Sequence, residues 1–148
     1  MEEQGQITHP SGELDPDVQR ELLARARSAA QRAYVPYSNF PVGAAGLASD
    51  GSIYDGSNVE NASFSLTICA ERSAIVAAVF AGAREIVAIA VSAPKMPLTS
   101  PCGACRQVLN EFRPANQDMM VILDDESAGE PVRLESLLPR AFGPRNLE

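Results

Sequence analysis

The sequence is poor in cysteine and histidine, and its basic residues are outnumbered. It holds three cysteines and a single histidine, His9, among 148 residues. An odd number of cysteines in a chain of this length disfavours a secreted disulfide scaffold, so we expect a reducing, cytoplasmic location. The 12 basic residues face 19 acidic ones, for a net charge of -7. Because polyanion binding draws on clustered lysine and arginine, this balance argues against nucleic acid as a partner.

Long apolar runs are also lacking. No stretch is long enough to cross a membrane, and the first residues, MEEQGQITHPSGELDP, are acidic and polar where a secretory signal would need a basic start and an apolar stretch. We therefore expect neither a membrane partner nor a secretory signal. A hydrophobic content of 45% suffices for one core, and the chain is too short for two ordinary domains. We expect residues 1–14 to form a mobile tail and residues 15–148 a single domain.

Apolar spacing and turn residues predict an alternation of helices and strands. The predicted elements are a helix over residues 16–34 after Asp15, strands over 41–48 and 52–58 joined by a turn at Asp50 and Gly51, a buried helix over 68–81 ending at Gly82, a strand over 85–93, a helix from Ser100 and Pro101 to about Phe112, a strand over 119–125, and a short terminal helix broken by Pro139. This order indicates an α/β fold, with a mixed sheet covered by helices on both faces.

The three cysteines are spaced as metal ligands could be. Cys102 and Cys105 are three positions apart, which puts both on one face of a helix, and Cys69 begins the other buried helix. If both helix N-termini converge, three sulfurs meet where backbone N–H groups favour negative charge. Thiolates suit zinc. With His9 in the tail as the only other soft donor, the fourth position stays open, as in a catalytic site.

An acid and a base follow the first cysteine in the stretch CAERSAI. Glu71 is close enough to the predicted metal site to exchange a proton with a bound water without being a ligand. Three thiolates on Zn²⁺ leave a net charge of -1, which weakens the metal as an acid. Hydrogen bonds from Arg72 to the cysteine sulfurs would offset that charge.

Less specific interpretations exist for each of these residues. A buried cysteine is most often a small hydrophobic residue, and Glu71 with Arg72 could be a solvated helix pair. The CGAC stretch alone would also suit a redox pair of thioredoxin type. The redox interpretation leaves Cys69, Glu71 and Pro101 without a role, so the pattern favours a metal.

Five segments in order, YVPYSNFPVGAA, GSNVENASF, CAER, PCGACRQVLNEF and LLPRAFGP, resemble the homotetrameric zinc-dependent cytidine deaminases. The resemblance spans residues 16–144. It implies a three-layer α/β/α sandwich with a mixed five-stranded sheet and one Zn²⁺ per subunit. It also implies hydrolytic deamination of cytidine and 2'-deoxycytidine to uridine and 2'-deoxyuridine plus ammonia in pyrimidine salvage. The implied mechanism is attack of zinc hydroxide on C4 of the base, with Glu71 as proton shuttle.

The resemblance also assigns residues to the site. The metal ligands would be Cys69, Cys102 and Cys105, the substrate contacts Phe40, Asn58, Glu60, Ala70 and Phe142, and the supports of the zinc cysteines Arg72 and Gln107. Asn58 and Glu60 would bind the ribose, chiefly its 3'-hydroxyl, and the Ala70 N–H would meet the base carbonyl.

Two aromatic positions near the site bear on assembly. Phe142 would reach the pocket of a neighbouring subunit, so that each site needs the homotetramer. The less specific interpretation of Phe142 is an aromatic that anchors a terminal helix. Phe64 stands where relatives often carry tyrosine, which puts one contact between subunits in doubt.

Three other functions compete with cytidine deamination. The first is deamination of another cytosine nucleoside such as blasticidin S, against which the ribose pair and Phe40 argue. The second is a zinc-stabilised binding module without catalysis, in which Glu71 would be dispensable. The third is editing of cytosines in RNA or DNA, which the net charge disfavours.

Overall fold

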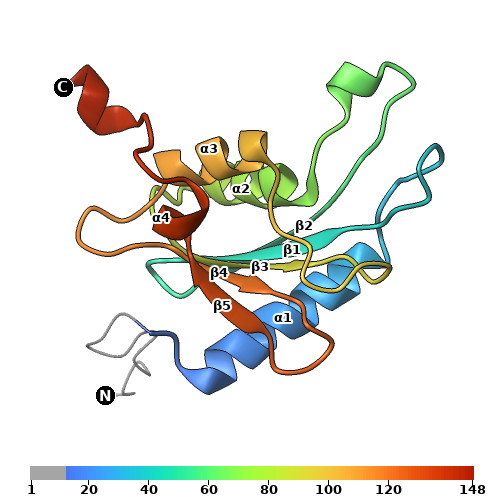
Figure 1. Ribbon diagram of the computed structural model, residues 1–148, viewed down its shortest axis with the longest axis horizontal. Helices are drawn as coiled ribbons and strands as arrows, with labels where there is room; N and C mark the ends of the chain where they lie inside the picture. Colours follow the sequence, from blue (N-terminus) through green and yellow to red (C-terminus); the bar gives the residue numbers. More distant parts are fainter. Residues whose placement is uncertain (1–12) are drawn as a thin grey trace.

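A computed structural model describes residues 13–148 (Figure 1). The predicted tail lies almost wholly in residues 1–12, which fall outside the described residues, as does His9. Along the chain the elements are α1 (Pro16–Ala30), β1 (Gly43–Ala48), β2 (Ile53–Ser57), η1 (Phe64–Leu66), α2 (Ala70–Phe80), β3 (Ile86–Ser92), α3 (Gly103–Glu111), β4 (Met120–Leu123), β5 (Glu130–Arg133), α4 (Leu134–Leu137) and η2 (Pro144–Leu147).

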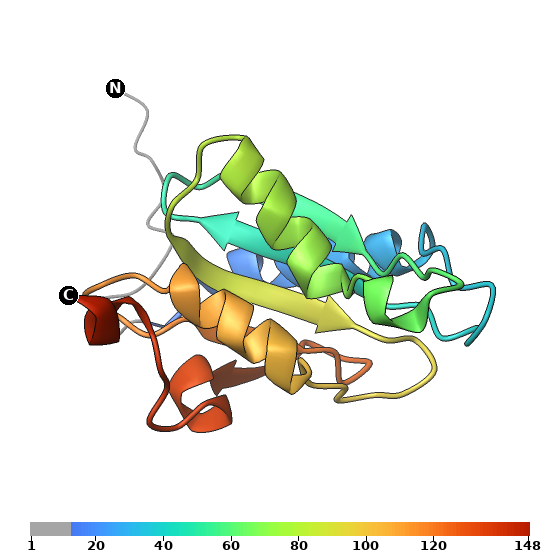
Figure 2. The same ribbon diagram turned by 90° about the horizontal axis from the view of Figure 1, so that it is seen from above.

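The five strands form one mixed sheet in the order β2-β1-β3-β4-β5. β3 and β4 run parallel, and the other neighbouring pairs are antiparallel. The helix α1 covers one face, whereas α2 and α3 lie side by side on the other (Figures 1 and 2). The predicted α/β/α architecture with a mixed five-stranded sheet is therefore confirmed.

Close packing on the hairpin fixes where α2 begins. At Gly56 in β2, an added Cβ would lie 2.3 Å from the Ala74 nitrogen and 2.6 Å from the Ala70 carbonyl oxygen of α2. On the opposite face, an added Cβ at Gly43 would lie 2.0 Å from the Ala26 oxygen of α1. Both approaches are too close for any side chain, so these glycines let the helices rest directly on the sheet. The first turn of α2, which follows Cys69, is thereby held against β2.

Two helix boundaries differ from the prediction. The helix α1 ends at Ala30, before the expected residue 34, because the Tyr34 amide donates to the Asn58 carbonyl at 3.0 Å and joins Tyr34 to the segment after β2. The helix α3 begins at Gly103 with Cys102 as its N-cap, so the expectation that Ser100 and Pro101 cap it was wrong.

The C-terminal third holds elements that the pattern did not predict. The edge strand β5 contains Pro131 and is mostly exposed, so it lacks the apolar alternation that marks a strand. The terminal helix is a single turn, α4, which ends before Pro139 as expected, and the later turn η2 was not predicted. At the other end, Leu14, placed in the tail by the prediction, is 7% exposed and packs in the core. Among residues 13–148, no helix has the length and apolar character needed to span a bilayer.

Candidate active site

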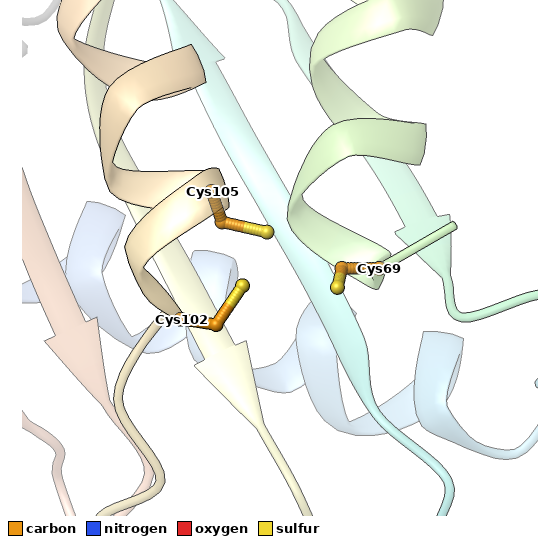
Figure 3. Close-up of side chains that lie close together, drawn as sticks. All are labelled: Cys69, Cys102 and Cys105. Atoms are coloured by element: carbon orange, nitrogen blue, oxygen red, sulfur yellow. The ribbon is translucent and has the colours of Figure 1, made fainter. Parts of the chain in front are cut away.

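Three sulfur atoms converge where α2 and α3 begin (Figure 3). Cys69 is the N-cap of α2, Cys102 is the N-cap of α3, and Cys105 lies in the first turn of α3. Their sulfur atoms all lie within 4.8 Å of one another. The arrangement is the one that a single metal ion needs from three monodentate ligands.

The side chains of the two N-cap cysteines do not hydrogen-bond the backbone amides of the helices that they begin. Both have extended backbones, with φ -70° and ψ 153° at Cys69 and φ -67° and ψ 169° at Cys102, and neither side chain makes a capping hydrogen bond. A serine or aspartate at an N-cap would turn its oxygen onto the amides of the first turn. The cysteine sulfurs instead face one another, with the positive ends of two helix dipoles beneath them.

The charges of the sulfur cluster are in conflict without a cation. The Cys105 thiol, with further help from Arg72, lowers the pKa of Cys69 to about 5. The same interaction with Cys69, together with burial, raises the pKa of Cys105 above the usual value of a thiol. One sulfur therefore keeps its proton because the other is ionised. A soft divalent cation would allow all three thiols to ionise, so the donor set fits zinc.

Arg72 stands against this cluster. Its Nη2 atom donates to the Cys69 sulfur at 3.5 Å and to the Thr67 carbonyl oxygen at 3.3 Å. The hydrogen bond to Cys69 raises the pKa of the guanidinium. The Nε atom of Arg72 is buried and has no hydrogen-bond partner within the described chain. A permanent positive charge is thus held beside the sulfurs with spare donor capacity.

Glu71 is buried beside the same cluster. It is 4% exposed, which is unusual for a carboxylate without a salt bridge. Burial raises the pKa of Glu71, and the negative charge of Cys69 adds to the effect. A carboxyl group with a raised pKa takes up a proton more readily than an exposed carboxyl group does, which suits a group that accepts and releases a proton in turn. The first turn of α2 also presents the buried Ala70 at the helix start, where backbone N–H groups lack intrahelical partners.

A second segment runs beside the start of α2. Val59 and Ile68 pair in an antiparallel bridge, each amide donating to the other's carbonyl oxygen at 2.9 Å. Ile68 directly precedes Cys69. The bridge therefore brings the segment of Asn58 and Glu60 alongside the residue that precedes Cys69.

Asn58 and Glu60 also hold the loop that carries Phe40. The Asn58 Oδ1 atom accepts from the Val42 amide and its Nδ2 donates to the Phe40 carbonyl, both at 2.9 Å. Glu60 accepts from the amides of Tyr37 and Ser38 at 3.0 and 3.2 Å, all through Oε1. Hydrogen bonds from Ser38 and then from the Tyr37 amide lower the pKa of Glu60, which keeps it ionised. Sequence reasoning missed this anchoring role, whose only signal was two polar residues flanking Val59.

Gln107 and Phe142 meet beside α3. The Gln107 Nε2 atom donates to the Phe142 carbonyl oxygen at 2.9 Å, rather than supporting Arg72 or a cysteine. The Phe142 side chain is 59% exposed, on a segment beside the later turns of α3. Sequence reasoning did not single out Arg106. Its guanidinium donates to the Pro101 and Leu137 carbonyl oxygens and to the Ser100 hydroxyl. Its position directly after Cys105 was the only available signal.

Comparisons with known proteins agree with this geometry. A family model described as the cytidine and deoxycytidylate deaminase zinc-binding region matches residues 16–121. The cytidine deaminase of Sporosarcina psychrophila is 48% identical over 132 residues, which are 88% of this chain and 95% of that protein. The cytidine deaminase of Mycobacterium tuberculosis is 42% identical over 129 residues, covering 86% of this chain and 92% of the other.

Solved structures of similar proteins share the fold. The crystal structure of cytidine deaminase from Burkholderia pseudomallei superposes with a TM-score of 0.76 at 42% identity, over 82% of this chain and 97% of that one. The crystal structure of cytidine deaminase from Mycobacterium tuberculosis gives a TM-score of 0.72 at 42% identity, over 83% and 95%. The fold and the zinc-binding region of this chain are thus those of the relatives.

Proposed function

Because the chain belongs to the cytidine and deoxycytidylate deaminase family, we propose that it hydrolyses cytidine and 2'-deoxycytidine to uridine and 2'-deoxyuridine, with release of ammonia. The chain is an enzyme of cytidine deaminase type, with zinc as its cofactor. The observation that carries the proposal is the cluster of three cysteine sulfurs with the carboxyl group of Glu71 buried beside it. This is the set of groups that the attack of water on an amidine carbon needs.

Cys69, Cys102 and Cys105 would hold the zinc. When bound, zinc supplies a Lewis acid that polarises a water molecule and lowers its pKa. Within the described residues, these three side chains are the one group of cysteine, histidine and acidic donors placed for a metal, so a fourth position is left for water. Arg72 donates to the Cys69 sulfur and withdraws negative charge from the ligand set.

Glu71 carries the proton through the reaction. Its carboxylate accepts the proton of the attacking water while the oxygen adds to C4 of the base, and it passes that proton to N3. Glu71 then takes the second proton from the hydroxyl group now on C4 and delivers it to the amino group, so that the C4–N bond breaks, ammonia leaves and the C4 carbonyl forms. The raised pKa of Glu71 supports both directions of transfer, because the group is neither a strong acid nor permanently charged.

Asn58 and Glu60 would bind the sugar, and the amide of Ala70 would donate to the base carbonyl oxygen. The proposal is supported by the bridge at Val59, which lies one residue from each of the pair. Both backbone amides that donate to Glu60 use its Oε1 atom, which supports a role for Oε2 towards a ribose hydroxyl. A contact mainly with the 3'-hydroxyl admits cytidine and 2'-deoxycytidine alike. Phe40, held by Asn58, would lie against the nucleoside.

Assembly into a homotetramer with shared sites is part of the proposal. Several large apolar side chains are exposed in the single chain, among them Val76 (65%), Phe80 (93%) and Phe64 (75%). Val76 and Phe80 are one turn apart on α2, so they share a face that a second subunit would cover. Phe142, also exposed, would then reach the base bound by a neighbouring chain.

We further propose a small-molecule substrate and a cytoplasmic location, with neither nucleic acid nor membrane as partner. The net charge of -7 supports the exclusion of polyanions. The three cysteines are free, and a reducing compartment would keep them available to the metal.

The proposal is tested by ammonia release from cytidine, 2'-deoxycytidine and blasticidin S, using zinc-loaded protein whose zinc content is measured. We expect one zinc per chain and turnover of both cytosine nucleosides, with cytidine outcompeting blasticidin S. Turnover of blasticidin S alone would overturn the assigned substrate. One bound zinc without any ammonia release would favour a binding module instead of an enzyme.

A further inference from the structure

The helix that carries two of the three sulfurs also grips the C-terminal segment. Three side chains of α3, which we call the C-terminal clamp, point to residues 137–143: Arg106, Gln107 and Asn110. Figures 1 and 2 show α4 and the red segment that follows it alongside α3.

Two residues of the clamp donate hydrogen bonds to the same carbonyl group. The Phe142 carbonyl oxygen accepts from the Gln107 Nε2 at 2.9 Å and from the Asn110 Nδ2 at 3.2 Å. Because a carbonyl oxygen only accepts, both amide nitrogens must face it. Two donors on one backbone oxygen fix the position of that peptide group more tightly than its exposed location requires.

Asn110 is placed at a cost in stability. It is 6% exposed, and its Oδ1 atom is buried without a hydrogen-bond partner within the described chain. Such an acceptor costs about 1–3 kcal/mol. An apolar residue of the same shape would avoid this cost, so the hydrogen bond to Phe142 is the visible gain. Gly143 fits the same contact, since a Cβ there would lie 2.7 Å from the Asn110 Nδ2.

Arg106 connects the clamp to the metal ligands. Its Nε donates to the Pro101 carbonyl at 2.7 Å and its Nη2 to the Ser100 hydroxyl at 2.8 Å, directly before Cys102. Its Nη1 donates to the Leu137 carbonyl at 2.8 Å. One guanidinium therefore ties the loop that ends at a zinc ligand to the start of the C-terminal segment.

The clamp holds the Phe142 carbonyl against the part of α3 that lies away from Cys102. Gln107 and Asn110 lie about 8 and 12 Å along the helix axis from Cys102, at roughly 1.5 Å per residue. The Phe142 side chain stays 59% exposed there. A rigidly held but uncovered aromatic is suited to packing on something outside the chain.

We propose that Arg106, Gln107 and Asn110 are positioning residues that fix Phe142 for contact with the nucleoside bound in a neighbouring subunit. The inference rests on the proposed function and adds to it the residues that set the aromatic in place. Loss of the clamp would leave zinc and Glu71 untouched and would weaken substrate binding in the adjacent site.

The test uses the zinc-loaded oligomer with Gln107→Met and Asn110→Leu combined, beside Phe142→Ala. Both clamp substitutions remove a donor at nearly constant size, and Asn110→Leu also removes the unpaired acceptor. We expect KM for cytidine to rise roughly 3- to 10-fold with kcat nearly unchanged, as for a lost aromatic contact. Adding Phe142→Ala to the double variant should raise KM no further, because both changes remove one interaction.

Controls separate this role from general stability. Glu111→Gln, on the same helix and without a side-chain hydrogen bond within the described chain, should leave kcat, KM, zinc content and oligomeric state unchanged. In the double variant, amide hydrogen exchange should become faster in residues 138–145, and its rate should stay unchanged in the other segments. If the double variant fails to fold, Gly143→Ala disturbs the clamp from the other side and should raise KM by the same factor.

Three results would overturn the clamp: a KM within twofold of wild type while Phe142→Ala raises it, an additive effect of the two changes, or unchanged exchange of residues 138–145. A wild-type protein that releases no ammonia from cytidine would instead overturn the proposed function. The exchange measurement still decides in that case whether the clamp holds the segment.

Discussion

Two charged clusters on opposite faces of the sheet differ in how fully their polar groups are paired within the chain. Behind the sheet, the Asp124 carboxylate accepts four hydrogen bonds, two from Arg27, one from the Ser92 hydroxyl and one from the Glu126 amide. These contacts, the one from Arg27 first, lower the pKa of Asp124 to about 2. Every charge in this network has its partner inside the chain.

The cluster at the start of α2 and α3 is left incomplete. Cys69 and Cys105 compete for one proton, burial raises the pKa of Glu71, and the Arg72 Nε is buried without a partner within the described chain. The difference indicates that the second cluster is completed by groups that are not part of the chain, a cation and a substrate.

Removal of one sulfur should have the largest effect. We expect Cys105→Ser to abolish both zinc binding and ammonia release, because two thiolates do not make a tight zinc site. Metal analysis and the deamination assay on the same preparation check this. Ala104→Ser, an exposed change in the same helical turn, is the matched control and should be silent. Full activity in Cys105→Ser would show that the cluster is not completed by zinc.

Removal of the positive charge beside the sulfurs should have a smaller effect. We expect Arg72→Gln to lower kcat of the zinc-loaded enzyme by roughly 10- to 100-fold, as for other groups that hydrogen-bond a metal ligand. Arg84→Gln serves as the control, because Arg84 is exposed and donates only to the Val79 and Ala83 carbonyls. A zinc-loaded Arg72→Gln enzyme with wild-type kcat would contradict the assigned role.

A substitution in the Asp124 network should lower the stability of the fold and leave the activity unchanged. We expect Asp124→Asn to lower the free energy of unfolding by about 2 kcal/mol, since it removes the charge that pairs with Arg27 and replaces one of the two acceptor oxygens used by Arg27 and Ser92 with a donor. Denaturant unfolding measures this, and kcat of the folded enzyme should remain unchanged. The exposed pair Arg25–Asp55 provides the comparison, and Asp55→Asn should cost less than about 1 kcal/mol. Equal losses in the two variants would refute the contrast.

The stabilisation by Asp124 should depend on pH in a defined window. Its pKa is about 2 in the folded chain against the ordinary 3.8, so the folded state prefers the ionised form. The stabilisation is therefore complete above about pH 4 and is lost as the pH falls towards 2. The difference in Tm between wild type and Asp124→Asn should shrink across that window. A difference that stays constant down to pH 2 would contradict the assignment.

The central elements of the fold and the metal site could be predicted from the sequence, whereas the C-terminal elements could not. The strand β3 and the helix α2 were predictable because continuous apolar runs mark buried elements. The pairing of Cys102 with Cys105 was predictable because residues three positions apart lie on one side at the start of a helix, whereas Cys69 comes from the start of another helix. The strand β5 was missed because Pro131 and exposed neighbours give no apolar pattern.

Contacts made to backbone oxygens could not be predicted from residue types. Arg106 donates to the carbonyls of Pro101 and Leu137, and every residue of the chain offers such an acceptor. The same holds for Gln107, whose partner is the Phe142 carbonyl. Only the folded chain shows which carbonyl is within reach.

The most direct test of the central claim compares Glu71→Gln with wild type, measuring zinc content and ammonia release from cytidine on the same samples. The amide keeps the size of Glu71 and removes its ability to carry a proton. We predict one zinc per chain in both proteins and turnover lower in the variant by about 10²–10⁴-fold. A variant that binds one zinc and deaminates cytidine at the wild-type rate would contradict the account.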